Sequence, residues 1–207
     1  MSMNYTRREW LATVGTVSLA SAVRPLAITV ATKPLQGAFI ILSTPYTIEG
    51  NLHYEDLSTQ VDFLDRCGVH GLVWPQNSSE QRYLSKAERL RGMEVIAEAA
   101  RGKQPAVVFG VQADSTGEML EYAHHAESLN PDGMIAIPPT SARSLKDFQE
   151  YYEALCQVTS RPVFIQTSGG APDVEPTVEF IVNMASEFPN LGYVKEEREP
   201  VHKRMRD

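Results

Sequence analysis

Cysteine is scarce in this sequence, since 207 residues contain only Cys67 and Cys156. Two cysteines exclude a disulfide-rich scaffold, a four-cysteine zinc site and an iron–sulfur cluster. Both lie in segments with helical periodicity, and we interpret them as small core residues. Long apolar runs are also missing, because none reaches the roughly 18 residues that a membrane-spanning helix needs.

Basic residues are too few for a protein that binds nucleic acid. The sequence has 19 Lys and Arg against 26 Asp and Glu, and its formal net charge is −7. Nucleic acids and anionic membrane surfaces attract basic patches, so this composition argues against both as partners of the mature protein. The absence of a Gly-x-Ser-x-Gly motif argues against a serine hydrolase.

Cofactor motifs are missing as well. The segment Arg101–Gln104 lacks the flanking glycine and the hydroxyl residue of a phosphate loop. His124 and His125 are adjacent, so on a helix they point to different sides and cannot chelate one ion. We therefore expect neither a metal nor a bound cofactor.

The N-terminal segment has the layout of an export signal. Arg7 and Arg8 precede the uncharged stretch 12–23, and Ala20-Ser21-Ala22 offers a small-residue cleavage site. The paired arginines resemble the twin-arginine type of bacterial signal, which carries folded proteins across the membrane. We predict that residues 1–33 are signal and linker and that 34–207 form the domain, exported to the periplasm. The alternative is a cytoplasmic protein with an attached N-terminal helix.

Six short apolar runs alternate with helical patterns along the rest of the chain. The runs are continuous in apolar character, which is typical of parallel strands buried on both faces. They begin near residues 38, 71, 106, 133, 163 and 192 and are about 31 residues apart. Helices are expected over 56–67, 86–101, 116–129, 144–159 and 176–188, and Ser85 with Glu88 forms a capping box.

This period predicts a (β/α)8 barrel of the TIM type. Eight such units need roughly 250 residues, so we expect only about the first six βα units here and interpret the chain as a fragment. A doubly wound open sheet is the structural alternative, although no Gly-x-Gly-x-x-Gly follows the first strand. In both architectures ligands bind at the carboxyl ends of the strands.

The residues that follow the strands are rich in hydroxyl and amide groups, and Lys195 ends the last strand. Hydroxyls suit a carboxylate, and a lysine in a dry barrel mouth can attack a carbonyl carbon. The alternative is a structural lysine that is paired with Glu196 or Glu197. Strand alternation places Tyr193 and Lys195 on one face and Glu196 on the other.

The order of these motifs resembles the dihydrodipicolinate synthase/N-acetylneuraminate lyase family of Schiff-base aldolases. The matching stretches are 37–45, 68–71 with 77–80, 84–89, 138–139 and 192–196. The resemblance implies a (β/α)8 barrel, often a homo-oligomer, in which a lysine forms an imine with pyruvate or a related 2-oxo acid. No cofactor beyond this imine is implied.

Carried over residue by residue, the resemblance makes Lys195 the imine lysine. Asn77, Ser78 and Ser79 fall in the loop that holds the carboxylate of the 2-oxo acid, and Glu80 matches that loop's structural glutamate. Thr44, after the first strand, belongs to the same substrate-binding set.

Two positions depart from the family. Gln166 stands where the family has its proton-relay tyrosine, and a carboxamide can donate a hydrogen bond but cannot cycle a proton near neutral pH. The arginine of the synthase subgroup has no match near Ala171, and Thr140 stands where a tyrosine often reaches in from a neighbouring subunit. Lysine biosynthesis is therefore not expected.

Three interpretations follow. The first is an aldolase, lyase or dehydratase that acts on a 2-oxo acid, with Lys195 as nucleophile and Gln166 as hydrogen-bond donor. The second is a non-catalytic barrel that binds a small acid. The third is an inactive truncated fragment.

Overall fold

The computed structural model describes residues 33–206, so the predicted export signal lies outside the described residues. Strands and helices alternate, as the periodicity predicts. Their order is β1 (Phe39–Ile41), α2 (Tyr54–Arg66), β2 (Gly71–Trp74), η1 (Asn77–Ser79), α3 (Lys86–Ala99), β3 (Ala106–Gly110), α4 (Thr116–Ser128), β4 (Gly133–Ala136), α5 (Leu145–Val158), β5 (Val163–Gln166), α6 (Val178–Glu187), β6 (Tyr193–Lys195) and α7 (Val201–Arg204).

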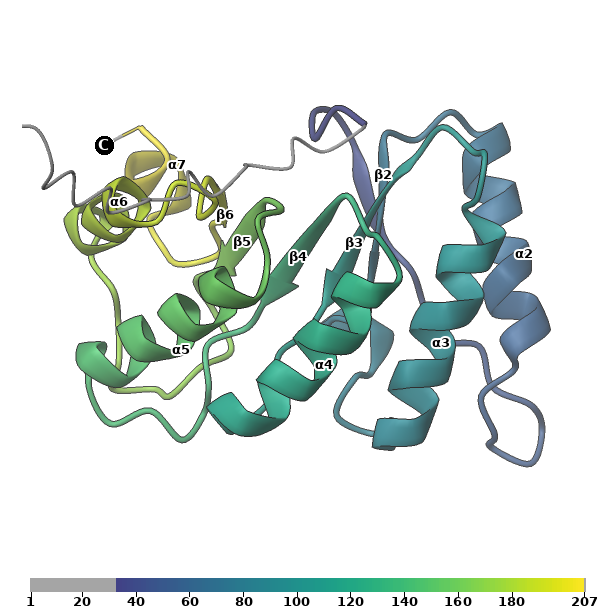
Figure 1. Cartoon of the computed structure of the whole chain (residues 1–207), viewed down its shortest axis with the longest axis horizontal. Coiled ribbons are helices and arrows are strands. Elements are labelled where there is room, and N and C mark those ends of the chain that lie inside the picture. Colours follow the sequence, from purple (N-terminus) through teal and green to yellow (C-terminus); the bar gives the residue numbers. More distant parts are fainter. Residues whose placement is uncertain (1–32, 207) are drawn as a thin grey trace, which may run out of the picture.

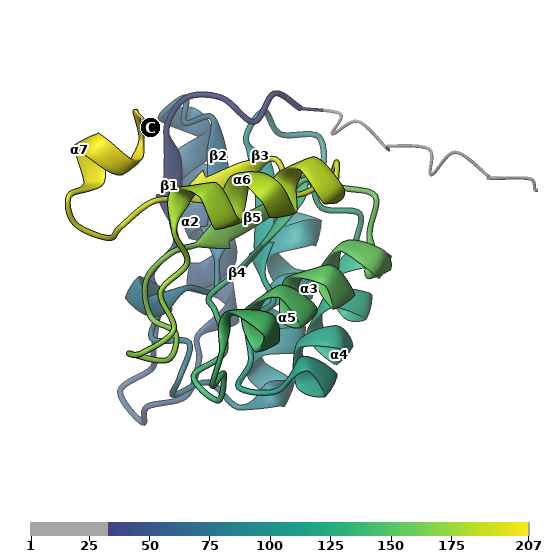
Figure 2. The same ribbon diagram turned by 90° about the vertical axis from the view of Figure 1, so that its left-hand side faces the viewer.

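The six described strands form one parallel sheet whose spatial order, β1 to β6, is the order in the chain. Helices α3, α4 and α5 lie side by side along one face of the curved sheet (Figures 1 and 2). A doubly wound fold would reverse its strand order and place helices on both faces. The described residues therefore form six successive units of a (β/α)8 barrel, and the open-sheet alternative is wrong.

The helices begin where hydroxyl side chains cap them. Ser85, Ser115, Ser144 and Thr177 each accept a bond from the backbone amide three residues later. The predicted capping box is confirmed, because the Ser85 amide also donates to Glu88 Oε2 at 2.8 Å. Helix α2 begins two residues before the expected position because His53 Nδ1 accepts from the Asp56 amide.

The two faces of the sheet bury separate clusters. The larger cluster fills the space between sheet and helices and includes Trp74, Phe109 and Tyr152. A smaller one, centred on Val73, Val108 and Ile135, lies on the inner face of the sheet. This division follows strand alternation and identifies which side chains point into the barrel.

The two cysteines differ in burial, so one interpretation needs correction. Cys156 is buried in α5, but Cys67 is exposed at the C-cap of α2, so its interpretation as a core residue is wrong. A one-turn helix, α7, lies in the charged stretch after residue 198. Within residues 33–206, no helix is both long and apolar enough to cross a membrane.

Candidate functional site

The site is built at the carboxyl ends of β5 and β6. The two strands pair in parallel, and the register sets Gln166 beside Lys195. One layer below, Phe164 stacks on Tyr193 with ring centroids 4.5 Å apart. Because Phe164 packs on the inner cluster, Gln166 and Lys195 also point to the inside of the barrel.

Lys195 makes two polar contacts within this site. Its Nζ lies 2.9 Å from Glu197 Oε1 and donates to Gln166 Oε1 at 3.4 Å. The amide of Gln166 continues the network, since its Nε2 donates to Ser168 Oγ at 3.3 Å. The Ser168 hydroxyl in turn donates to Glu197 Oε2. Lys195, Gln166, Ser168 and Glu197 thus close a ring of hydrogen bonds, which we call the lysine ring.

The lysine ring is only partly shielded from water. Gln166 is 1% exposed, whereas the side chains of Lys195 and Glu197 are 32% and 37% exposed. Burial raises the pKa of Glu197, but the bonds from Ser168 and Lys195 outweigh it and hold that pKa below its ordinary value. Glu197 is therefore a carboxylate at neutral pH.

Glu196 faces the other way, as strand alternation predicts. Its Oε1 accepts from Thr167 Oγ1 at 2.6 Å, and its Oε2 lies 3.0 Å from Arg204 Nε. Burial alone would raise the pKa of Glu196. Bonds from Thr167, the Arg198 amide and Arg204 nevertheless lower it. This carboxylate fastens the segment after β6 and does not share the space of Lys195.

The loop after β2 holds the predicted carboxylate-binding residues. Ser79 is fully buried, and its hydroxyl donates to the Leu42 carbonyl at 2.6 Å and accepts from the Gln76 amide at 3.1 Å. Thr44 Oγ1 donates to the Ser79 carbonyl at 2.6 Å and accepts from Trp74 Nε1 at 3.1 Å. The hydroxyls of Thr44 and Ser79 are thus engaged in holding the loop, whereas Ser78 is exposed.

Asn77 is the residue of this loop that lies near the lysine ring. A Cβ added to Gly169 would lie 3.3 Å from Asn77 Nδ2 and 4.0 Å from Gln166 Nε2. The two amide groups therefore both lie near Gly169, and the Ile137 side chain comes closer still, at 2.9 Å from the same point. Gly169 also has a φ of +86°, a conformation that favours glycine.

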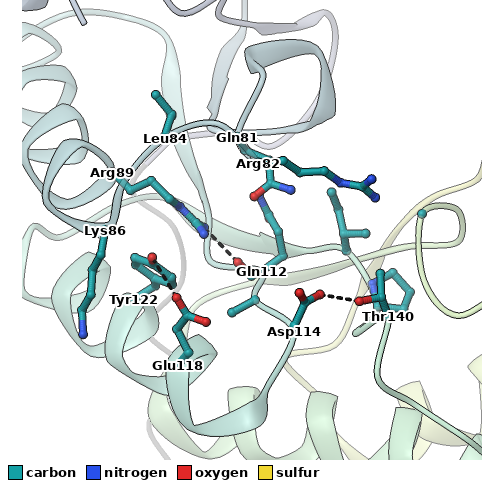
Figure 3. A pocket seen from close by; sticks show the side chains of 14 residues that line it. Gln81, Arg82, Leu84, Lys86, Arg89, Gln112, Asp114, Glu118, Tyr122 and Thr140 are labelled. Carbon is teal, nitrogen blue, oxygen red and sulfur yellow. Dashed lines mark hydrogen bonds between the residues drawn. The ribbon is translucent and has the colours of Figure 1, made fainter. Parts of the chain in front are cut away.

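Thr140 lies at the rim of a cavity of about 400 Å³ over the ends of β3 and β4, which Gly169 also lines. Figure 3 shows its hydroxyl directed at Asp114 and the Arg89 guanidinium directed at Gln112. The other labelled charged side chains come from α3, α4 and the loop before α3. The structure does not join Thr140 to Lys195 by any described contact.

Two members of the lysine ring are absent from the sequence-based site, namely Ser168 and Glu197. A signal for both was available. Residues at i and i+2 share a face of a strand, so Glu197 follows Lys195 and Ser168 follows Gln166 on the inner side. Of the two partners that the sequence offers for a paired Lys195, the structure has Glu197 and not Glu196.

The part of the chain from residue 33 to 206 contains no group of three or more His, Cys, Asp or Glu side chains that could hold a metal ion. The arrangement offers an amine and a hydroxyl that each contact the same carboxylate. An amine beside a carboxylate at a strand end can form and release an imine with a carbonyl compound.

The fold and this site define a protein of the (β/α)8 class with a lysine at the end of the sixth strand. The chain belongs to the dihydrodipicolinate synthetase family, whose model matches residues 34–206.

Individual relatives agree. The 4-hydroxy-tetrahydrodipicolinate synthase of Neisseria meningitidis serogroup B is 28% identical over 163 residues, which are 78% of this chain and 55% of that protein. Dihydrodipicolinate synthase from Aquifex aeolicus has a TM-score of 0.76 at 24% identity and covers 82% of this chain and 57% of its own. YagE from E. coli K12, solved in complex with pyruvate, has a TM-score of 0.74 at 22% identity over 82% of this chain and 57% of its own. The chain spans about half the length of the curated relatives it matches.

Proposed function

We propose that this protein is a Schiff-base-forming lyase or aldolase that acts on pyruvate or a related 2-oxo acid. The observation that carries the proposal is the inward-facing Lys195 at the carboxyl end of β6, in register with the buried Gln166. Membership of the family supports the reaction class. The pyruvate bound to YagE supports the substrate class.

In the proposed reaction the amine of Lys195 adds to the carbonyl carbon of the 2-oxo acid and water leaves, which gives an imine. The imine draws electrons from the neighbouring carbon, so that carbon can lose a proton and then add to an aldehyde. Read in reverse, the same steps cleave a carbon–carbon bond. Asn77 and the exposed Ser78 hold the acid's carboxylate at the opposite side of the strand ends.

Gln166 accepts from the Lys195 amine and donates to Ser168, so it orients both. It cannot take up a proton, and we therefore propose that the second substrate and the proton path differ from those of the synthases. The partner is a small-molecule acid. A homo-oligomer and export through the segment 1–33 belong to the same proposal.

Borohydride trapping tests the proposal directly. The full chain is incubated with pyruvate and a panel of 2-oxo acids and reduced, and the modified peptide is identified by mass. We expect a mass increase on Lys195 that disappears in Lys195→Ala. Lys146→Ala, on the surface of α5, is the matched control and should trap like the unchanged protein.

A binding protein without catalysis is the second candidate, because Lys195 is ion-paired and Gln166 cannot relay protons. It predicts saturable binding of the acid without a reducible adduct. A folded protein that binds pyruvate but gives no adduct on Lys195 would overturn the lyase proposal in favour of this one.

A further inference from the structure

Glu197 places a carboxylate in direct contact with the proposed nucleophile. Its Oε1 lies 2.9 Å from Lys195 Nζ, and its Oε2 accepts from Ser168. The β5–β6 register ends with Gln166 beside Lys195. Ser168 and Glu197 follow two residues later, so the same alternation, continued past the strand ends, places them on the inner face as well. Each oxygen of the carboxylate therefore faces a different member of the lysine ring.

Formation of an imine needs a group that moves protons. Lysine enters as an ammonium with three protons on nitrogen and ends as an iminium with one. The two others leave on the oxygen of the 2-oxo acid as water. Gln166, the residue nearest to Lys195 on β5, has no exchangeable proton of suitable acidity. A carboxylate at hydrogen-bond distance has the chemistry that this transfer requires.

We propose that Glu197 is the catalytic acid and base of the imine chemistry and that Ser168 is its positioning residue, an inference that rests on the proposed role of Lys195. Glu197 first takes a proton from the Lys195 ammonium. The free amine forms its bond to the carbonyl carbon as the carbon–oxygen π bond breaks, and Glu197 returns the proton to that oxygen.

The second half repeats the transfer. Glu197 takes a proton from the carbinolamine nitrogen cation and gives it to the hydroxyl group. The carbon–oxygen bond then breaks, water leaves, and the nitrogen lone pair forms the iminium. The carboxylate ends as it began, so no other reactant is consumed. Gln166 holds Ser168 with its Nε2, and Ser168 fixes Glu197 Oε2, which leaves Oε1 for Lys195.

A purely electrostatic role for Glu197 predicts the opposite effect of a substitution. A carboxylate that only pairs with the ammonium keeps the proton on Lys195. Its removal would release free amine and make trapping faster. Loss of a proton-transfer group makes trapping slower, typically by about 100-fold or more. The sign of the change in rate therefore separates the two roles.

The experiment measures the rate of borohydride-trapped adduct on Lys195 with pyruvate as the probe, in the full chain and its variants. We expect Glu197→Gln to be slower by roughly 100-fold. Glu197→Asp keeps the charge but shortens the side chain by one methylene. Its trapping rate should lie between those of the unchanged protein and Glu197→Gln. In Glu197→Ala, added acetate should restore the rate in proportion to its concentration, which a structural role would not produce.

Glu199→Gln is the matched control, since Glu199 is an exposed carboxylate two residues further on, and it should trap at the unchanged rate. Trapping of Glu197→Gln at an equal or higher rate overturns the role of Glu197 and leaves that of Lys195 intact. If the glutamine variant does not fold, a Glu197→Asp protein with an unchanged rate has the same consequence. Absence of any adduct in the unchanged protein defeats both proposals.

Discussion

The strand ends of β2 and β3 differ from those of β5 and β6 in how their polar groups are held. On the β2–β3 side, Gln76 Nε2 donates to Gln112 Oε1 at 3.0 Å, and Gln112 Nε2 donates to the Pro75 carbonyl at 2.9 Å. Both side chains are buried and neutral. On the β5–β6 side, the network includes an ion pair, Lys195 with Glu197, whose side chains are about one-third exposed.

The difference separates support from chemistry. A buried neutral hydrogen bond is costly to leave unmade, about 1–3 kcal/mol for each stranded group, so it fixes geometry. An ion pair that is one-third exposed contributes only about 0–1 kcal/mol and can exchange partners. The loop after β2 is therefore the rigid side of the candidate site, and the lysine ring is the side to which we assign the proposed chemistry.

Gly110→Ala should lower the stability of the loop side of the site, and we expect it to have the largest effect of the substitutions considered. Gly110 ends β3, and a Cβ there would overlap the Pro75 carbonyl oxygen and approach Gln76 Nε2 and Gln112 Oε1 at 2.8 and 3.0 Å. The backbone oxygen cannot withdraw without disturbing the β2–β3 pairing. We expect a loss of at least about 3 kcal/mol in the free energy of unfolding, measured by urea denaturation.

Gly117→Ala provides the control for this substitution. Gly117 lies in the first turn of α4, and nothing approaches the position of its Cβ within 4 Å. Alanine there should leave stability unchanged or raise it by up to about 1 kcal/mol. Similar losses in both variants would show that the crowding around Gly110 does not exist.

Ser79→Ala and Ser78→Ala compare a supporting hydroxyl with one that is free to bind. Removing the Ser79 hydroxyl strands the Leu42 carbonyl and the Gln76 amide, and we expect a loss of about 2 kcal/mol. Ser78→Ala should change stability by less than about 0.5 kcal/mol. It should instead raise the pyruvate concentration needed for half-maximal trapping. Equal stability losses would contradict this division of roles within η1.

Much of this fold is predictable from the sequence because its signals are local. The β2 and β5 strands begin at the predicted residues 71 and 163, where β-branched and apolar residues replace the polar and proline residues before them. Ends that depend on capping by a side chain are less regular. The start of α2 was misplaced because His53 is an uncommon cap, and Cys67 was assigned to the core because helical spacing alone does not locate the last turn.

The site is predictable in part. Lys195 and Gln166 follow from strand ends and from the resemblance to the family, and the structure brings them into contact. What no local pattern reveals is which groups already satisfy one another. Ser79 is assigned to the ligand by its place in the loop, yet its hydroxyl bonds to residues 37 positions and 3 positions away. Pairing across strands depends on register, which only the folded chain specifies.

Glu196→Gln tests whether a charged residue beside the lysine ring stabilises the fold. Glu196 is ionised, yet its bonds to Thr167 and Arg204 hold the segment after β6. Its pKa is lowered in the fold, so the carboxylate stabilises the native state above its unfolded pKa, near 4.3. That contribution disappears as the pH falls through the lowered value. We expect the variant to lose about 1 kcal/mol of stability at pH 7, through weakened bonds to Thr167 and Arg204, and to approach the unchanged protein in strongly acidic solution.

Glu187→Gln is the control, because Glu187 is exposed. Its free energy of unfolding should stay within about 0.5 kcal/mol of the unchanged protein at both pH values. If Glu196→Gln loses the same stability at every pH, the Glu196 side chain contributes through packing and its charge does not stabilise the fold.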